Sequence, residues 1–239
     1  MPGILDKSVD MVLADLPYGQ TLHKWDCEIN LELLWPELLR ITKDYSALVF
    51  TATNPFSSRL VMSKPEYYRN EWIWEKEKGV NHLLVNFQPY RVHEHILVFS
   101  VAAAANRTKK NTQKPIRYTP QFTAGAAYSR PAPDRNTFNI KYDLHNADPI
   151  PHTKGEARRY PRSVIKFNKV SGKHPTQKPA ALFEYLIKTY TNEGDTVLDP
   201  TAGSGTTAVA CRKTNRHYIC IEKEPEYCAI AERRVKEML

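Results

Sequence analysis

Short apolar runs alternate with segments of helical spacing along most of the chain. The runs that predict buried strands lie at positions 9–14, 47–51, 71–75, 95–100, 196–199 and 217–221. Apolar residues three or four positions apart predict helices over residues 31–41, 55–63, 179–190, 206–212 and 225–238. Strands that alternate with helices favour an α/β fold, and we expect a mostly parallel, doubly wound sheet that includes an antiparallel strand.

Three details of this pattern can be compared directly with a structure. Asn30 precedes the 31–41 helix and is a suitable N-cap, because its side chain can accept a backbone N–H. Pro36 lies inside the same helix and should kink it or mark a restart, since proline has no N–H to donate. The run at 9–14 is apolar on both faces, so its strand should lie inside the sheet.

The segment 101–165 differs from the rest of the chain. It has little periodicity and predicts a loop-rich insertion. It holds twelve Lys or Arg and four acidic residues, an excess of eight that equals the net charge of the whole chain, +8. Basic residues interleaved with tyrosines are typical of a nucleic-acid surface. The alternative is a solvated insertion that happens to be basic.

Length and composition exclude several other classes. The 239 residues suffice for one large α/β domain, and they contain neither a bilayer-spanning apolar run nor a signal peptide. The four cysteines lack the spacing of a metal site, so we expect no metal site. We interpret the cysteines as core thiols of a protein in a reducing compartment.

The candidate chemistry begins at Asp15-Leu16-Pro17-Tyr18-Gly19, directly after the first strand. Pro17 and Gly19 end that strand, so a carboxylate, a carbonyl and an aromatic ring lie together at its carboxyl end. Ligands bind at this end of strands in open α/β sheets. The three groups suit a planar base that carries an exocyclic amino group, although an ordinary turn could have the same sequence.

A second candidate is the glycine-rich turn between the strand 196–199 and the helix 206–212. Gly203 and Gly205 allow a ligand to approach the backbone, and the helix N-terminus offers free amide groups. Glu222 ends the next strand, where an acid can accept hydrogen bonds from both hydroxyls of a ribose. The turn lacks the GK[ST] of a P-loop, so it is not a phosphate-binding loop of that kind.

These stretches resemble the motifs of one family. Asp15-Leu16-Pro17-Tyr18 resembles the DPPY motif of S-adenosylmethionine-dependent amino methyltransferases, and the segment 199–205 resembles their cofactor-binding motif. The segment 174–179 is similar to HPTQKP. The order of the three motifs is similar to that of the beta class of bacterial and phage DNA methyltransferases. The resemblance implies a Rossmann-like methyltransferase fold, with S-adenosyl-L-methionine as cofactor and double-stranded DNA as partner.

The resemblance also implies a set of site residues. Asp15 and the Pro17 carbonyl would accept the two N–H bonds of the base amino group, and Tyr18 would stack on the flipped base. The expected cofactor-binding residues are His174, Thr176, Gln177, Lys178, Asp199, Pro200, Thr201, Ala202, Gly203, Ser204, Gly205, Thr206, Thr207 and Glu222. Thr176 or Gln177 could instead cap the following helix. The expected DNA-binding residues are Lys109, Lys110, Lys114, Arg117, Arg158, Arg159 and Arg162.

The chain is therefore expected to have three parts. Residues 1–100 would form the catalytic half of the methyltransferase domain, 101–165 a target-recognition insertion, and 166–239 the cofactor-binding half. The resemblance implies restriction–modification as the setting, in the cytoplasm of a bacterial or phage-infected cell. Asp at position 15 favours adenine N6 as the methyl acceptor. The alternatives are cytosine N4, an RNA base or a protein amide, and an inactive DNA-binding or partner subunit.

Two departures from the family pattern carry expectations of their own. Leu16 stands in place of one proline of DPPY, which leaves both hydrogen-bond acceptors in position. Family members have a strand and a helix before this motif, and Met1–Lys7 leaves no room for them. The strand 218–221 is then expected to be a sheet edge. The cofactor site would be incomplete or completed by a partner, such as a second copy of the chain.

Overall fold

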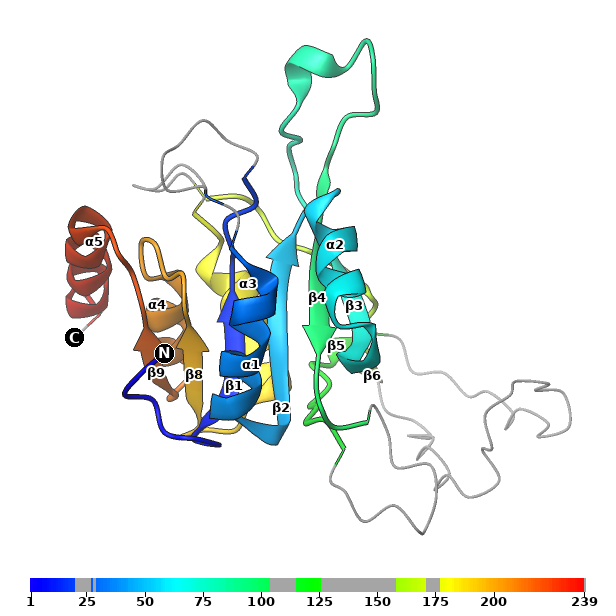
Figure 1. Cartoon of the computed structure of the whole chain (residues 1–239). Coiled ribbons are helices and arrows are strands. Elements are labelled where there is room, and N and C mark those ends of the chain that lie inside the picture. The colour runs from blue at the N-terminus through cyan, green and yellow to red at the C-terminus, as the bar shows by residue number, and fades with distance from the viewer. Residues whose placement is uncertain (20–26, 28, 104–114, 126–157, 171–176, 239) are drawn as a thin grey trace, which may run out of the picture.

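One seven-stranded sheet contains all six predicted strands. The computed structural model describes residues 1–19, 27, 29–103, 115–125, 158–170 and 177–238. The strand order is β7-β3-β4-β2-β1-β8-β9. The strands are β1 (Val9–Ala14), β2 (Thr42–Ala52), β3 (Tyr68–Glu75), β4 (His93–Phe99), β7 (Val164–Lys166), β8 (Thr196–Asp199) and β9 (His217–Cys220). The predicted α/β fold is confirmed (Figure 1).

The direction of the strands decides where a site can form. Strand β4 is antiparallel to both of its neighbours, β2 and β3, and the other neighbouring pairs are parallel. Strands β1, β2, β3, β8 and β9 therefore all end at one edge of the sheet, which we call the carboxyl edge. It lies at the top of Figure 1. The expected mostly parallel sheet with an antiparallel strand is confirmed.

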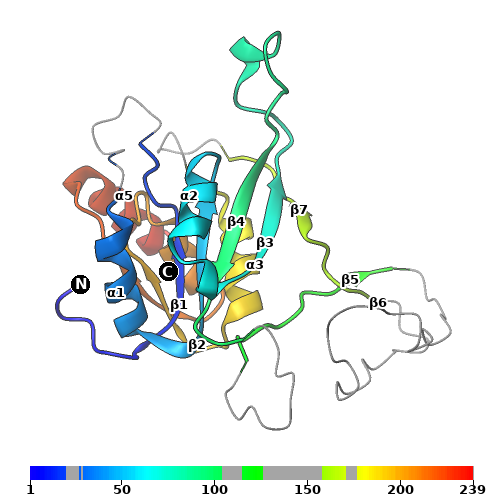
Figure 2. The same cartoon turned by 45° about the vertical axis from the view of Figure 1, so that its right-hand side comes forward.

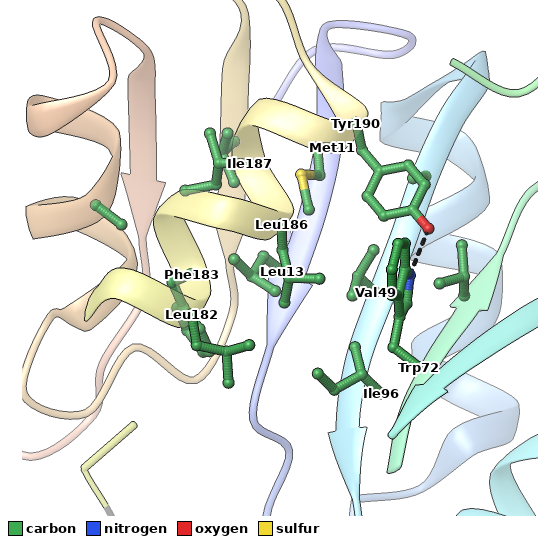
Figure 3. Packing of buried hydrophobic residues seen from close by; sticks show 14 of the residues in the cluster. Met11, Leu13, Val49, Trp72, Ile96, Leu182, Phe183, Leu186, Ile187 and Tyr190 are labelled. Carbon is green, nitrogen blue, oxygen red and sulfur yellow. Dashed lines mark hydrogen bonds between the residues drawn. The ribbon is translucent and has the colours of Figure 1, made fainter. Parts of the chain in front are cut away.

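Helices cover both faces of the sheet. They are α1 (Leu31–Ile41), α2 (Phe56–Ser63), α3 (Ala180–Tyr190), α4 (Thr206–Lys213) and α5 (Pro225–Lys236). Helices α1 and α2 contribute Trp35, Leu38 and Phe56 to one core cluster. Helices α3 and α4 pack on the opposite face, where Leu186 and other side chains of α3 meet Met11, Leu13 and Val49 of the central strands (Figure 3). The sheet is thus buried on both faces, as the apolar strands require.

A polar contact ties the second cluster together. The indole Nε1 of Trp72 on β3 donates to the hydroxyl of Tyr190 on α3 at 2.8 Å (Figure 3). Both side chains are buried, so each polar group satisfies the other without water. This bond joins the predicted catalytic half to the predicted cofactor-binding half in the interior.

The start of α1 confirms the predicted cap, and its interior excludes one of the two outcomes predicted for Pro36. The Asn30 side chain accepts from the N–H groups of Glu32 at 2.9 Å and Leu33 at 3.3 Å. Pro36 lies within one continuous helix, so it does not mark a restart. Buried residues before and after it, including Trp35 and Leu38, pack on the same face of the sheet. Their packing outweighs the loss of one helical hydrogen bond.

Strand β2 is longer than its apolar run predicts, because polar contacts extend it. It begins at Thr42, directly after α1, instead of at position 47. The added residues hold β1 through side chains: Lys43 donates to Asp10 at 2.7 Å and Ser46 donates to the Val9 carbonyl at 3.0 Å. Such polar contacts cannot be predicted from a pattern of apolar residues.

Strands β1 and β9 occupy the positions that the sequence predicts. Strand β1 lies between β2 and β8, and all six of its residues are buried. Strand β9 is the outermost strand of the sheet within the described part of the chain. A partner that covers this edge stays a prediction.

The described parts of the basic segment are joined to the main domain. Ala102 and Ile116 lie in the core, and β7 extends the sheet by pairing in parallel with β3. A separate two-stranded sheet, β5 (Thr123–Ala124) with β6 (Arg158–Arg159), lies away from the main sheet (Figure 2). The boundaries at 101 and 165 stay a prediction. None of the helices in the described residues is long and apolar enough to span a bilayer.

Candidate active site

Asp15 lies at the carboxyl edge, where β1 ends, and three groups hold its carboxylate. Oδ1 accepts from the hydroxyls of Tyr18 and Thr51, each at 2.5 Å. Oδ2 accepts from Nζ of Lys178, also at 2.5 Å. Three donors from separate segments therefore fix the orientation of this carboxylate before any ligand binds.

The cation that pairs with Asp15 belongs to a larger buried set of charges, which we call the charge network. Lys178 also lies 3.6 Å from Oε2 of Glu94 on β4, and the other oxygen of Glu94 accepts from Lys76, the residue after β3. The Lys76 and Lys178 side chains are only 4% and 8% exposed. Two acids and two lysines balance in charge, which is what burial of ions requires.

The pKa shifts of Lys178 and Glu94 favour their charged forms. Burial alone would lower the pKa of Lys178, but Asp15 and Glu94 outweigh burial and raise it. Burial likewise opposes ionisation of Glu94, but the two lysines outweigh it and lower the pKa of this carboxyl. At Lys76 burial dominates and lowers the pKa. Lys178 is therefore a fixed ammonium that faces Asp15.

Tyr18 points into the protein at the same place. Its ring stacks on Phe56 of α2, with 5.1 Å between the centroids. Its hydroxyl lies 2.9 Å from the Thr51 carbonyl as well as against Asp15. Burial, followed by the charge of Asp15, raises the pKa of Tyr18 well above its ordinary value, so the phenol stays protonated. The expected stacking of Tyr18 on a base stays a prediction.

The glycine turn after β8 lies beside Asp15. Thr201 donates through its hydroxyl to the Asp15 carbonyl at 3.1 Å, and the hydroxyl of Ser204 donates to Gln177 at 3.3 Å. Gly203 and Gly205 have φ values of 51° and 75°, a region that favours glycine. The structure thus brings together Asp15, the turn, and Gln177 and Lys178 before α3, which are far apart in the sequence.

Two neighbours of the turn explain its shape. A Cβ at Gly205 would lie 2.6 Å from Cβ of Ala231 on α5, so this glycine allows α5 to pack against the turn. The Glu222 carboxylate accepts from the N–H of Gly203 at 2.8 Å, and also from those of Lys223 and Glu224. Glu222 therefore orients the turn and keeps lone pairs for a further donor.

Asp199 and Thr207 lie beneath the turn. Asp199 is 3% exposed, accepts from the Thr207 hydroxyl at 2.5 Å and accepts from the N–H of Thr201 at 3.1 Å. Thr207 is fully buried. Both residues lie in the interior, where they support the turn. Their predicted binding of the cofactor stays a prediction. Thr206 is also buried, and its hydroxyl lies 3.5 Å from the Lys178 carbonyl.

A cavity of about 530 Å³ lies where β9 ends, and Ala202, Ile221, Glu222 and residues of α5 line it. Its volume is within the range of small-molecule sites. A carboxylate at its wall and positive-φ glycines beside it are groups that can hold a nucleoside. These features fit the adenosine part of S-adenosylmethionine.

The described residues that are predicted to bind DNA lie away from this site. Arg117 pairs with Asp195, just before β8, and lies over the Tyr45 ring, so it is at the opposite end of the sheet from Asp15. Arg158 and Arg159 form β6, and Arg162 is exposed just after it. His174, Thr176, Lys109, Lys110 and Lys114 lie outside the described residues. All of these assignments stay predictions.

Sequence reasoning missed Glu94, Lys76 and Thr51. Lys76 and Glu94 flank the long connection between two predicted strands, and Thr51 ends the strand beside β1. Each is a polar residue at the end of an apolar run, which is the signal that could have found them.

Comparison with known proteins identifies the class. The chain belongs to the DNA methylase family, whose model matches residues 9–233. It is 48% identical to the Type II methyltransferase M.HpaI of Haemophilus parainfluenzae over 245 residues, 96% of this chain and 69% of that protein. It is 39% identical to M.HinfI of Haemophilus influenzae, over 98% of this chain and 65% of that protein. The family predicted from the motifs is confirmed.

Other similarities are partial or concern the fold. Against M2.DpnII of Streptococcus pneumoniae the identity is 49%, but the match spans 30% of this chain and only 26% of that protein; M2.LlaDCHI and M2.MboI are matched over a similar share. The M1.HpyAVI–SAM complex has a TM-score of 0.59 at 23% identity, with 96% of this chain and 90% of that chain covered. The cytosine-N4-specific PvuII methyltransferase has a TM-score of 0.62 at 16% identity, with 97% and 81% covered.

The buried carboxyl of Asp199 predicts a specific pH dependence. Burial raises its pKa from 3.8 to about 7. Between these values the folded protein holds a proton that the unfolded chain lacks, so the free energy of unfolding falls by about 1.4 kcal/mol per pH unit as pH rises, and levels off above the folded pKa. Asp199→Asn should lack this fall. Denaturant titration of both proteins from pH 5 to 8 measures the difference, and parallel profiles would contradict the assignment.

Proposed function

We propose that this chain transfers a methyl group from S-adenosyl-L-methionine to the exocyclic amino group of a base in double-stranded DNA. Membership in the DNA methylase family supports this reaction class. The observation that carries the proposal is the position of Asp15, whose carboxylate lies at the carboxyl edge beside the glycine turn and is held by Lys178 at 2.5 Å. The group that would accept hydrogen bonds from the base therefore lies next to the candidate cofactor site.

The groups around Asp15 suit an amino acceptor. The exocyclic nitrogen of a base is a weak nucleophile, because its lone pair is delocalised into the ring. Hydrogen bonds from its two N–H groups to Asp15 and to the Pro17 carbonyl would localise that pair on nitrogen. The Tyr18 hydroxyl can turn to the Thr51 carbonyl at 2.9 Å, which leaves a lone pair of Oδ1 for the base. Such orientation with charge placement accounts for much of enzymatic rate enhancement.

Lys178 has a defined part in this scheme. Its ammonium donates to Oδ2 and fixes the orientation of the Asp15 carboxylate, which would accept an N–H of the base. Glu94 and Lys76 contact neither base nor cofactor in this proposal and are positioning residues for Lys178. The bound cofactor supplies an electrophilic methyl group, and no covalent intermediate with the protein is needed.

The cofactor would lie between the glycine turn and the end of β9. Glu222 can accept from a ribose hydroxyl, and Gln177, which accepts from Ser204 of the turn, would contact the rest of the cofactor. His174, Thr176 and Lys178 belong to the same proposal through the segment that contains them. We propose adenine N6 as the acceptor because an Asp, and not a Ser, stands at position 15.

Removal of the Asp15 carboxylate tests the proposal. DNA from bacteria that express the chain should carry N6-methyladenine at one recognition sequence, and Asp15→Ala should abolish it. Calorimetry should show affinity for S-adenosylmethionine within a few-fold of wild type, because Asp15 faces the acceptor. Asp44→Ala, at an exposed aspartate far from the carboxyl edge, is the matched control and should keep the methylation.

Three outcomes would count against parts of this scheme. Persistent methylation by the Asp15 variant would remove this residue from the reaction. N4-methylcytosine at the recognition sequence would replace the adenine assignment. Cofactor binding without any methylated DNA would favour a DNA-binding or partner subunit.

The basic segment should hold the DNA backbone. Replacement of exposed Arg158 and Arg162, together with Lys109, Lys110 and Lys114, by Gln should weaken DNA binding and flatten its salt dependence, because phosphate contacts release counterions. Lys188→Gln with Arg212→Gln, two exposed cations on α3 and α4, should leave the slope unchanged. An unaltered slope in the first variant would mean that the segment is only a solvated surface.

A further inference from the structure

A loop with exposed apolar side chains rises from the carboxyl edge. It joins β3 to β4 over residues 76–92, and we call it the edge hairpin. Both views show it projecting well beyond the end of the sheet (Figures 1 and 2). Leu83 is 82% exposed and Phe87 is 85% exposed, and Leu84 and Val85 between them are also exposed. Four apolar side chains at the end of one projection are unusual for a soluble surface.

The edge hairpin is held by its own hydrogen bonds. The N–H of Lys76 donates to the Val92 carbonyl at 2.7 Å, and that of Val80 donates to the Arg91 carbonyl at 3.2 Å. The Asn81 side chain accepts from the N–H of Arg91 at 2.7 Å and donates to the Pro89 carbonyl at 3.1 Å. A 3₁₀ turn at His82–Leu84 shapes the tip. The loop therefore presents its apolar side chains from an ordered frame.

The polar residues of the edge hairpin favour an anionic partner. Lys78 and Arg91 lie below the apolar tip, and the acid Glu77 accepts from the N–H of Lys169 at 2.7 Å. Nε of Arg91 is buried without a hydrogen bond among the described residues. Cations around an apolar tip match a duplex, which has phosphates outside and stacked bases inside.

The root of the edge hairpin leads directly to the candidate catalytic carboxylate. Lys76 is its first residue, and Glu94 follows it on β4. These two residues and Lys178 form the charge network that ends at Asp15. The apolar tip is thus anchored by buried ion pairs to the group that would hold an extruded base.

We infer that Leu83 and Phe87 form an apolar wedge that enters DNA beside the target base and fills the space the base leaves in the stack. This inference rests on the proposed function. A base inside a duplex is out of reach of Asp15, and its extrusion costs a few kcal/mol. Apolar side chains inserted between base steps offset that cost.

A comparison of two substrates tests the wedge. The double variant Leu83→Ala, Phe87→Ala is made at exposed positions, so it should fold normally, and thermal melting checks this. The substrates are one duplex with the recognition sequence paired and the same duplex with a mismatch at the target base. Leu33→Ala, at a 72% exposed leucine on α1, is the matched control.

The wedge should matter only where extrusion is costly. The double variant should methylate the paired duplex at least about tenfold more slowly than wild type, and the mismatched duplex at nearly the wild-type rate, since the mismatch lowers the cost of extrusion. Equal loss on both duplexes would overturn the inference, because it would mean a general defect. Unchanged rates on both would also overturn it and would point to a protein partner for the tip.

The outcomes separate this inference from the function on which it rests. If wild type methylates the paired duplex and the double variant does so equally well, only the wedge fails. If wild type methylates neither duplex, the proposed function fails and the wedge fails with it. The Leu33→Ala control should match wild type on both substrates.

Discussion

The ion pair between Asp15 and the buried Lys178 is the constraint on which the site depends. Charges are stable in a protein interior only when they are paired and hydrogen-bonded. Here two acids and two lysines form ion pairs with each other, and they come from the end of β1, the residue after β3, the start of β4 and the segment before α3. These segments meet only if the strands end at the carboxyl edge in the observed order. The fold and the charge network therefore require each other.

The same pair connects the two halves of the site. Lys178 holds the Asp15 carboxylate, and its neighbour Gln177 contacts Ser204 of the glycine turn. Thr201 of that turn bonds the Asp15 backbone. Gln177 and Lys178 thus connect Asp15, which would bind the base, to the glycine turn, which would bind the cofactor. In the interior, the Trp72–Tyr190 bond joins the same two halves of the domain. Orientation of a methyl acceptor toward a methyl donor depends on this junction.

Much of this architecture could be predicted from the sequence. Apolar runs and helical spacing predict most strands and helices, because an element can bury one face when its apolar residues recur with the period of that element. Asn30 capped its helix as local chemistry predicts. The glycine turn and Asp15 are recognisable in the sequence, because glycines mark backbone freedom and a polar residue after an apolar run marks the end of a strand.

The remainder depends on contacts between distant residues. Glu94 and Lys76 become part of the site only through Lys178, which lies 84 and 102 positions further along the chain. Asp199 and Gly205 lie in a recognised motif, yet they serve the interior and the packing of α5. Such roles follow from three-dimensional neighbours, which no local pattern contains. Pro36 likewise stays helical, because the packing of buried residues before and after it outweighs the tendency of proline to break a helix.

A double-mutant cycle on Asp15 and Lys178 tests the central claim most directly. The free energy of unfolding would be measured for wild type, Asp15→Asn, Lys178→Met and the double variant. If the two charges stabilise each other in the interior, the double variant should lose less than the sum of the single losses, by about 1–3 kcal/mol. Losses that add to within about 0.5 kcal/mol would contradict the account.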